Sequence, residues 1–326
     1  MIKQTLFLTA ALSLSLAACT AADDSVTSDG SKIDSAGLKS IEIAATYAFE
    51  TRSDVAMLAT SPNDVASWLG AVGVLGTDGQ LRFSDIEAVS TKPVSGNYSM
   101  VIGFDRAKAP ALFAAINPNG TWRGFVESSN TFDFSPVAIV GAPPGDTMIC
   151  QPFGAATTTL SALSPEGLVT YSATISDDGV LTLNAGEPSA IKVKDPASCL
   201  AAPDGSVIVS EPDKTIRFGS DGTAIRVSRI RYSSLATLVD EVLLGVYDTN
   251  LYAIDAATLE PIKKLSIEAG MSIQGAESIG KVFVTPSPFG GTAFNEGAVF
   301  LTDADKDRVV VISRGYFLRQ LRVADQ

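Results

Sequence analysis

The chain has no histidine among its 326 residues. This absence excludes Ser/His/Asp triads, phosphatases with a histidine nucleophile and zinc sites with histidine ligands, because each needs an imidazole. A glycine-rich phosphate-binding loop is missing too, since the paired glycines stand in turn segments between apolar runs. Carboxylates, lysines, arginines and tyrosines remain for chemistry, and the carboxylate oxygens would suit a hard metal such as calcium.

Cysteine is scarce, and the first of the three cysteines follows an N-terminal leader. Lys3 precedes an apolar run, Thr5 to Leu16, that is too short to span a bilayer. The run ends in Leu16-Ala17-Ala18-Cys19, which resembles a bacterial lipobox whose cysteine becomes lipidated. We predict a lipoprotein signal peptide at residues 1–18 and lipidation of Cys19; the alternative is an ordinary secretory signal cleaved near Ala18.

The residues after Cys19 indicate where the protein resides. Thr20 is not the aspartate that resembles an inner-membrane retention signal, so we expect an outer-membrane lipoprotein that faces the periplasm or the cell exterior. Residues 19–37 are rich in Ala, Ser, Asp and Thr, and their burial could not offset the entropy of ordering them. They predict a flexible tether, and residues 38–326 predict one folded domain.

The other two cysteines, Cys150 and Cys199, form an even pair in a compartment where disulfides persist. The sequence leaves two readings open: a bridge between the third and fourth repeat units, or two separate buried thiols. It does not reveal whether the two Cα atoms come within bridging distance.

Basic residues are outnumbered by acidic ones, with 24 Lys and Arg against 36 Asp and Glu and a net charge of -12. Such a surface disfavours nucleic acid as a partner and adhesion to anionic lipid headgroups. It tolerates divalent cations. The membrane contact that we expect is therefore the N-terminal lipid anchor.

Helical periodicity is weak throughout, and short apolar runs separated by turns take its place. Between Ala201 and Arg229, two Asp-Gly turns flank runs of β-branched and aromatic residues, which is typical of consecutive antiparallel hairpins. Similar hairpins recur with turn centres near positions 78, 119, 166, 221, 257 and 305, which are 36 to 55 residues apart. Because one propeller blade spans roughly 40 to 50 residues, we predict an all-β fold, a six-bladed β-propeller of four-stranded antiparallel sheets.

Two further segments complete this picture. We expect a strand at Leu38 to Phe49 to close the ring by pairing with the C-terminal segment Val309 to Leu321. The longest irregular stretch, Thr285 to Gly297, is a candidate lid or rim because long loops are uncommon unless functional.

Several stretches resemble the β-propeller phytases, calcium-dependent six-bladed phosphohydrolases that act on inositol hexakisphosphate. Val207 to Phe218 looks like the strand of that family that ends in an acidic run and continues to a basic residue and a phenylalanine. The order of other segments is also similar: Ser53 to Leu58, Ser61 to Asp64, Leu75 to Leu81 and Gly96 to Phe104. The resemblance implies a calcium site and a phosphorylated ligand.

The chain departs from the family at the residues that matter for hydrolysis. Ser53 replaces the first of two paired aspartates, so Asp54 persists alone, and Ile102 stands where a phosphate-binding arginine would be. The family's Asn-Asn-x-Asp motif and its two Glu-Gly steps are replaced by Asn97-Tyr98-Ser99-Met100, Ser198-Cys199 and Gln274-Gly275. Since hydrolysis on this scaffold needs several carboxylates around calcium ions, these losses predict an eroded catalytic site.

The acidic and basic residues that remain supply the candidate site residues. The candidate metal ligands are Asp54, Glu211 and Asp213, and no residue is assigned a catalytic role. The candidates for binding an anion such as phosphate are Lys214, Arg226, Arg229 and Arg231. The alternative for the carboxylates is a solvated turn, and for the basic residues a charged strand face.

Three functions stay open at this point. The first is a membrane-anchored phytase-like propeller that acts as a binding or scaffold module. The second is an active calcium-dependent phytase, a phosphomonoester hydrolase. The third is an interaction partner of an outer-membrane assembly that uses the propeller rim for docking.

Overall fold

A computed structural model gives the structure of the protein. It describes residues 33, 37–49, 52–57, 72–76, 80–84, 94–98, 100–104, 112–116, 119–127, 134–145, 147–152, 159–176, 180–271, 273–286, 292–303, 305–306 and 308–323. Cys19 and the predicted signal peptide lie outside these residues, as does most of the predicted tether.

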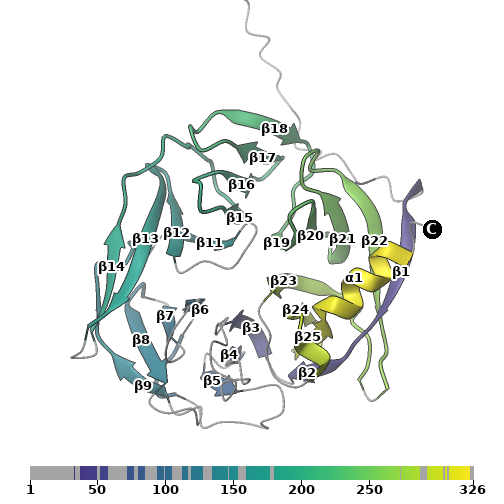
Figure 1. The fold of residues 1–326 in the computed structure, drawn as a ribbon, viewed down its shortest axis with the longest axis horizontal. Coiled ribbons are helices and arrows are strands. Elements are labelled where there is room, and N and C mark those ends of the chain that lie inside the picture. Colours follow the sequence, from purple (N-terminus) through teal and green to yellow (C-terminus); the bar gives the residue numbers. More distant parts are fainter. Residues whose placement is uncertain are drawn as a thin grey trace, which may run out of the picture.

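The sheets stand around a common axis, which is the arrangement of a β-propeller (Figure 1). Short apolar runs with alternating polar residues form the strands, and tight polar turns join each strand to the next, so neighbours pair as antiparallel meanders. The all-β propeller predicted from the sequence is confirmed.

The described strands fall into six groups, which we number in chain order. Group one contains β3 (Arg52–Met57), β4 (Val72–Gly76) and β5 (Leu81–Ser84). Group two contains β6 (Met100–Phe104), β7 (Leu112–Ile116), β8 (Trp122–Glu127) and β9 (Phe134–Val137). Group three contains β10 (Ile139–Val140), β11 (Met148–Pro152), β12 (Thr159–Ser164), β13 (Gly167–Ile175) and β14 (Leu181–Ala185).

The second half of the chain supplies the other groups. Group four contains β15 (Ser198–Ala201), β16 (Val207–Ser210), β17 (Thr215–Phe218) and β18 (Ala224–Ser228). Group five contains β19 (Ser234–Val239), β20 (Val242–Tyr247), β21 (Asn250–Asp255), β22 (Pro261–Glu268) and β1 (Lys39–Ala44). Group six contains β23 (Ile279–Thr285), β24 (Ala298–Asp303), β25 (Arg308–Ser313) and β2 (Tyr47–Phe49).

The number of four-stranded blades stays a prediction. Groups three and four share one nine-stranded sheet, because β11 pairs in parallel with β15 through Gln151 and Leu200. Group one has three strands among the described residues, and groups three and five have a fifth strand each.

The N-terminal strand connects two neighbouring groups. β2 pairs antiparallel with β25, with Tyr47 opposite Val311, as the closure predicted from the sequence requires. The first half of the predicted strand is different: β1 runs parallel to β22, with Ile43 opposite Ile267. The chain changes partner within two residues, since the Ala45 N–H donates to the Glu268 carbonyl and the Thr46 N–H to that of Val311.

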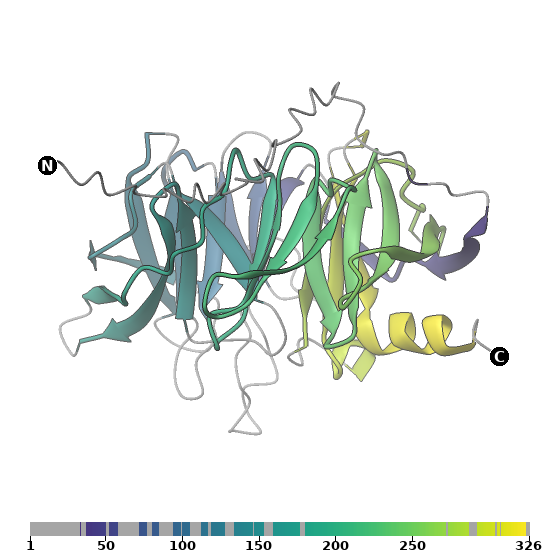
Figure 2. The same ribbon diagram turned by 90° about the horizontal axis from the view of Figure 1, so that it is seen from above.

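The C-terminal segment corrects the sequence prediction. β25 ends at Ser313, and residues Arg314–Val323 form the helix α1, although we expected a strand to Leu321 and no amphipathic helix. Ser313 starts the helix, because its Oγ accepts the N–H of Tyr316 at 3.4 Å. Phe317 and Leu321 are four residues apart and both buried, so one face of a short helix covers the end of group six (Figure 2).

The described helices are short. None of the described segments forms a helix that is long and apolar enough to cross a membrane. The 3-10 helix η2 (Thr292–Phe294) lies in the predicted lid, and Phe294 is buried there against Phe300 and Val311.

Candidate functional site

Two clefts lie at the same end of the ring. In a meander the turn between the second and third strands and the connection to the next group lie at one end of the sheet, because successive strands reverse direction. We call this end the connection face. The turns between first and second and between third and fourth strands lie at the opposite face, and the predicted lid after β23 is one of these.

Cleft one lies where group four begins. It has a volume of about 500 Å³ and is lined by the connection that precedes β15 and by the turn between β16 and β17: Lys192, Val193, Lys194, Glu211, Pro212, Asp213 and Lys214. The structure therefore brings three sequence candidates together, namely Glu211, Asp213 and Lys214.

Glu211 is the buried centre of cleft one. Its carboxylate accepts the Lys194 N–H at 2.9 Å and forms an ion pair with the Lys214 Nζ at 3.2 Å. The turn itself is closed by the Glu211 N–H, which donates to the Lys214 carbonyl at 2.8 Å. Because the side chain is only 8% exposed, the two bonds offset the cost of removing the carboxylate from water.

The remaining charged groups of cleft one face solvent. Lys192, Lys194 and Asp213 are exposed and Lys214 is partly exposed. The lining thus carries three lysines, one exposed carboxylate, Asp213, and one buried carboxylate that Lys214 already neutralises. The exposed part of the cleft is cationic and suits an oxyanion.

The other sequence candidates are not part of cleft one. Asp54 lies on β3 in group one, opposite Leu75 of β4, and its side chain is outside the described part of the structure. The Arg226 Nε donates to the Thr258 carbonyl at 3.1 Å, in the turn between β21 and β22 on the opposite face. Arg226 therefore links groups four and five.

Arg229 and Arg231 lie in the connection from β18 to β19, and both are exposed. The Tyr232 N–H donates to the Ser210 Oγ at 2.8 Å, so this connection runs beside the end of β16 on the connection face. The three predicted arginines thus divide between two faces of the ring.

No group of three or more Asp, Glu, Cys or His side chains converges among the residues that the structure describes. In cleft one, Glu211 and Asp213 are the two carboxylates, and a lysine ammonium already contacts the buried one. Cleft one therefore offers two carboxylates toward the six to eight oxygens that surround a calcium ion.

Cys150 and Cys199 form a disulfide between β11 and β15, with their Cα atoms 4.7 Å apart. Of the two readings that the sequence left open, the structure contains the bridge. It lies beside the parallel pairing of these two strands and fixes group four, which carries cleft one, to group three.

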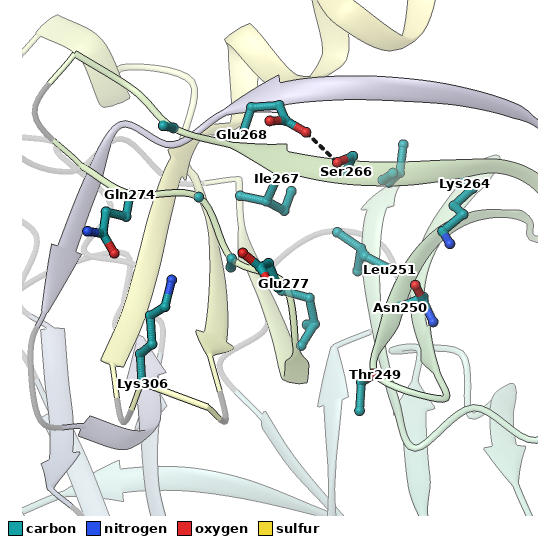
Figure 3. A pocket seen from close by; sticks show the side chains of 15 residues that line it. Thr249, Asn250, Leu251, Lys264, Ser266, Ile267, Glu268, Gln274, Glu277 and Lys306 are labelled. Carbon is teal, nitrogen blue, oxygen red and sulfur yellow. Dashed lines mark hydrogen bonds between the residues drawn. The ribbon is translucent and has the colours of Figure 1, made fainter.

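Cleft two lies between groups five and six and has a volume of about 570 Å³ (Figure 3). Its floor is apolar and consists of Leu251, Leu265, Ile267 and Ile279, all buried. Polar side chains surround the floor: Asn250, Lys264, Ser266, Glu268, Gln274, Glu277 and Lys306. One internal bond is present there, from the Ser266 Oγ to the Glu268 carboxylate at 2.6 Å.

Sequence reasoning missed most of both linings. Lys192 and Lys194 could have been found from their alternation around Val193, which places both on the same side of an extended segment. Cleft two combines four separate stretches of the chain, and one of its residues, Gln274, was noted only as a departure from a motif. No local pattern connects Lys264 with Lys306.

Comparison with known proteins identifies the class of fold. The crystal structure of Sqt1 from Saccharomyces cerevisiae, a β-propeller, is similar to this chain with a TM-score of 0.51 over 82% of this chain and 98% of that chain. The two sequences are 10% identical, so the likeness concerns the fold alone. No family model and no curated protein matches the sequence.

Proposed function

We propose that this protein is a phytase-like β-propeller that binds a phosphorylated small molecule in cleft one without hydrolysing it. The lipid anchor predicted at Cys19 would hold it at the outer membrane. The observation that carries the proposal is the environment of Glu211, whose carboxylate contacts the Lys214 ammonium at 3.2 Å and the Lys194 N–H at 2.9 Å.

The contacts of Glu211 disfavour calcium chemistry. A calcium ion at this carboxylate would have to displace Lys214 and would meet a cationic cleft with one further carboxylate, Asp213. Calcium-assisted hydrolysis needs several carboxylates to hold the ions that activate water. Lysine ammonium groups can instead bind a phosphate group directly, as point charges with three donors each.

The test is calorimetric titration of the purified full chain with inositol hexakisphosphate, with and without calcium, together with an assay for released phosphate. We expect binding that does not require calcium and no release of phosphate. Lys192→Gln and Lys214→Gln should each weaken binding severalfold, whereas Lys281→Gln on β23, outside both clefts, should not. Glu211→Gln should strengthen binding, because it removes the negative charge and keeps an acceptor for the Lys194 N–H.

Two outcomes would contradict the proposal. Calcium-dependent release of phosphate would favour an active phytase, and the absence of binding would exclude cleft one as a phosphate site. The anchor is tested separately: Cys19→Ala should abolish incorporation of labelled fatty acid and release the protein from the membrane fraction.

A further inference from the structure

Four polar or charged side chains that line cleft two have no partner among the residues that the structure describes. The side chains of Lys264, Gln274, Glu277 and Lys306 form no hydrogen bond or ion pair within the described part of the chain. This contrasts with the buried carboxylate of cleft one, which two neighbours satisfy. Unpaired donors and acceptors that point into a cleft with an apolar floor are the features of a binding site.

The connection that forms one wall of cleft two is held in place. The Ala276 N–H donates to the Ile267 carbonyl at 3.0 Å, and the Gly270 N–H donates to that of Ile273 at 2.8 Å. The Arg308 guanidinium donates to the Gly275 carbonyl. At Gly275 an added Cβ would lie 2.2 Å from the Ile267 carbonyl oxygen, so only glycine allows this approach. The cleft is therefore formed before any ligand binds.

The charges in cleft two alternate along its length. In Figure 3, Lys306 and Gln274 lie at one end, Glu277 and Glu268 lie between, and Lys264 lies with Asn250 at the other end. A ligand that matches this order needs negative charge at its two ends and positive charge between them. Inorganic phosphate and nucleic acid fit poorly, because each would place negative charge beside Glu277.

An exposed apolar side chain lies on the connection that forms one wall of cleft two. Met271, on the same connection as Gln274 and Glu277, is fully exposed at 106% of its reference area. Methionine is an adaptable apolar contact at protein-binding surfaces. The leucine and isoleucine side chains that line the floor make the base of the cleft apolar.

We propose that cleft two binds an extended peptide segment of a partner protein, with acidic side chains at both ends of the bound stretch and a basic side chain between them. In such a segment, the two acidic side chains pair with Lys264 and Lys306, and the basic side chain pairs with Glu277. Apolar side chains between the charged ones contact the floor. This proposal is independent of phosphate binding in cleft one.

The experiment measures fluorescence anisotropy at low salt with two labelled peptides, Glu-Val-Lys-Val-Glu and its charge-reversed counterpart Lys-Val-Glu-Val-Lys. We expect the first to bind at least tenfold more tightly to the full chain. Lys264→Gln and Lys306→Gln should each weaken its binding about threefold and together about tenfold, as exposed ion pairs do. Binding should weaken as salt is raised.

A charge exchange makes the test more specific. The Glu277→Lys variant should no longer bind the first peptide and should gain affinity for Glu-Val-Glu-Val-Glu, which the unmodified chain should bind weakly. Lys192→Gln in cleft one and Lys281→Gln serve as matched controls and should leave peptide binding unchanged. The proposal is overturned if the two peptides bind equally, if neither binds, or if the variants of cleft two keep the affinity of the unmodified chain.

Discussion

The two clefts of the connection face satisfy their charges in different ways. In cleft one the buried carboxylate of Glu211 is bonded to Lys194 and Lys214, so the protein itself supplies its counter-charge. In cleft two the side chains of Lys264, Glu277 and Lys306 have no partner among the described residues. The hydrogen-bonded carboxylate of Glu211 stabilises its turn, so the other lysines of cleft one can bind an anion. The unpaired charges of cleft two alternate in sign, so they favour a ligand whose charges alternate in the opposite order.

The structural support of the two clefts differs as well. Cleft one lies on group four, which a disulfide joins to group three. Cleft two depends on a buried ion pair at the β24–β25 hairpin, in which Arg308 contacts Asp303 at 2.9 Å and also binds the Gly275 carbonyl. Each cleft can therefore be weakened separately, cleft one through a covalent contact and cleft two through an electrostatic one.

The largest expected effect comes from removal of the disulfide. Cys150→Ala combined with Cys199→Ala should lower the free energy of unfolding by roughly 4 kcal/mol, because the bridge closes a loop across 49 positions and restricts the unfolded chain. Urea unfolding monitored by circular dichroism checks this, with reduction of the unmodified protein as the control. Phosphate binding in cleft one should weaken more than peptide binding in cleft two. Equal stability of the reduced and oxidised proteins would contradict the prediction.

The second effect concerns cleft two. Arg308→Ala should lower the free energy of unfolding by about 3 kcal/mol, because Asp303, which is 1% exposed, would become a buried charge without a partner. The Gly275 carbonyl would also lose its donor, so peptide binding should weaken while phosphate binding stays the same. Asp303→Leu combined with Arg308→Leu is the matched variant, and its stability should be close to that of the unmodified protein. If the Arg308→Ala variant lost phosphate binding and kept peptide binding, the prediction that each cleft can be weakened separately would be refuted.

The smallest expected effect on stability concerns Asp255, which lies at the opposite face and serves as a reference for both clefts. Backbone N–H groups of Thr258 and Ala257, at 2.7 and 2.9 Å, lower the pKa of Asp255 below its usual range. Since the folded pKa is lowered, the stabilisation is present above the unfolded value and is lost as the pH falls through the folded pKa. Asp255→Asn should therefore cost less than about 1 kcal/mol at pH 7 and a smaller amount at pH 2.

Urea unfolding at both pH values, with Glu42→Gln on the exposed side of β1 as the control, checks this prediction. A difference between Asp255→Asn and the unmodified protein that is as large at pH 2 as at pH 7 would show that the carboxylate charge is not its cause. Ligand binding in either cleft at pH 7 should be unchanged.

The sequence predicted the type of fold from hairpin signals, but the repeated hairpins are not equivalent in the structure. The turns near 119, 166 and 305 join second and third strands, whereas those near 221 and 257 join third and fourth strands. Alternation of apolar residues identifies a hairpin without specifying its place in a sheet. The same limit explains β1: its alternation predicted a strand, yet only packing beside Leu265 and Ile267 determines that it pairs with β22.

The helix α1 had a sequence signal that was too short to recognise. Ser313 as the N-cap and the i, i+4 pair of Phe317 and Leu321 span little more than two turns, and the apolar run Val309–Ile312 that precedes them favours a strand. Packing of Phe317 into the core cluster of groups five and six decides in favour of the helix.

The candidate site was predictable only where its residues are close in sequence. Glu211, Asp213 and Lys214 share one turn, so a local motif found them together. The arginines were grouped for the same reason, but Arg226 lies on a strand and reaches Thr258 in the next group, which no spacing reveals. The Lys214 ion pair of Glu211 lies within this turn, whereas its other contact, the Lys194 N–H, comes from the connection between two groups and has no local signal.

The sequence by itself determined the hairpins, the acidic balance and the exclusion of imidazole chemistry, because these follow from residue types and from contacts between near neighbours. Tertiary structure decided the disulfide, the partner of β1, the helix at the C-terminus and both clefts. Each of these depends on side chains that are distant in sequence and become neighbours only when the sheets close around a common axis, so their energies are not encoded in any local pattern.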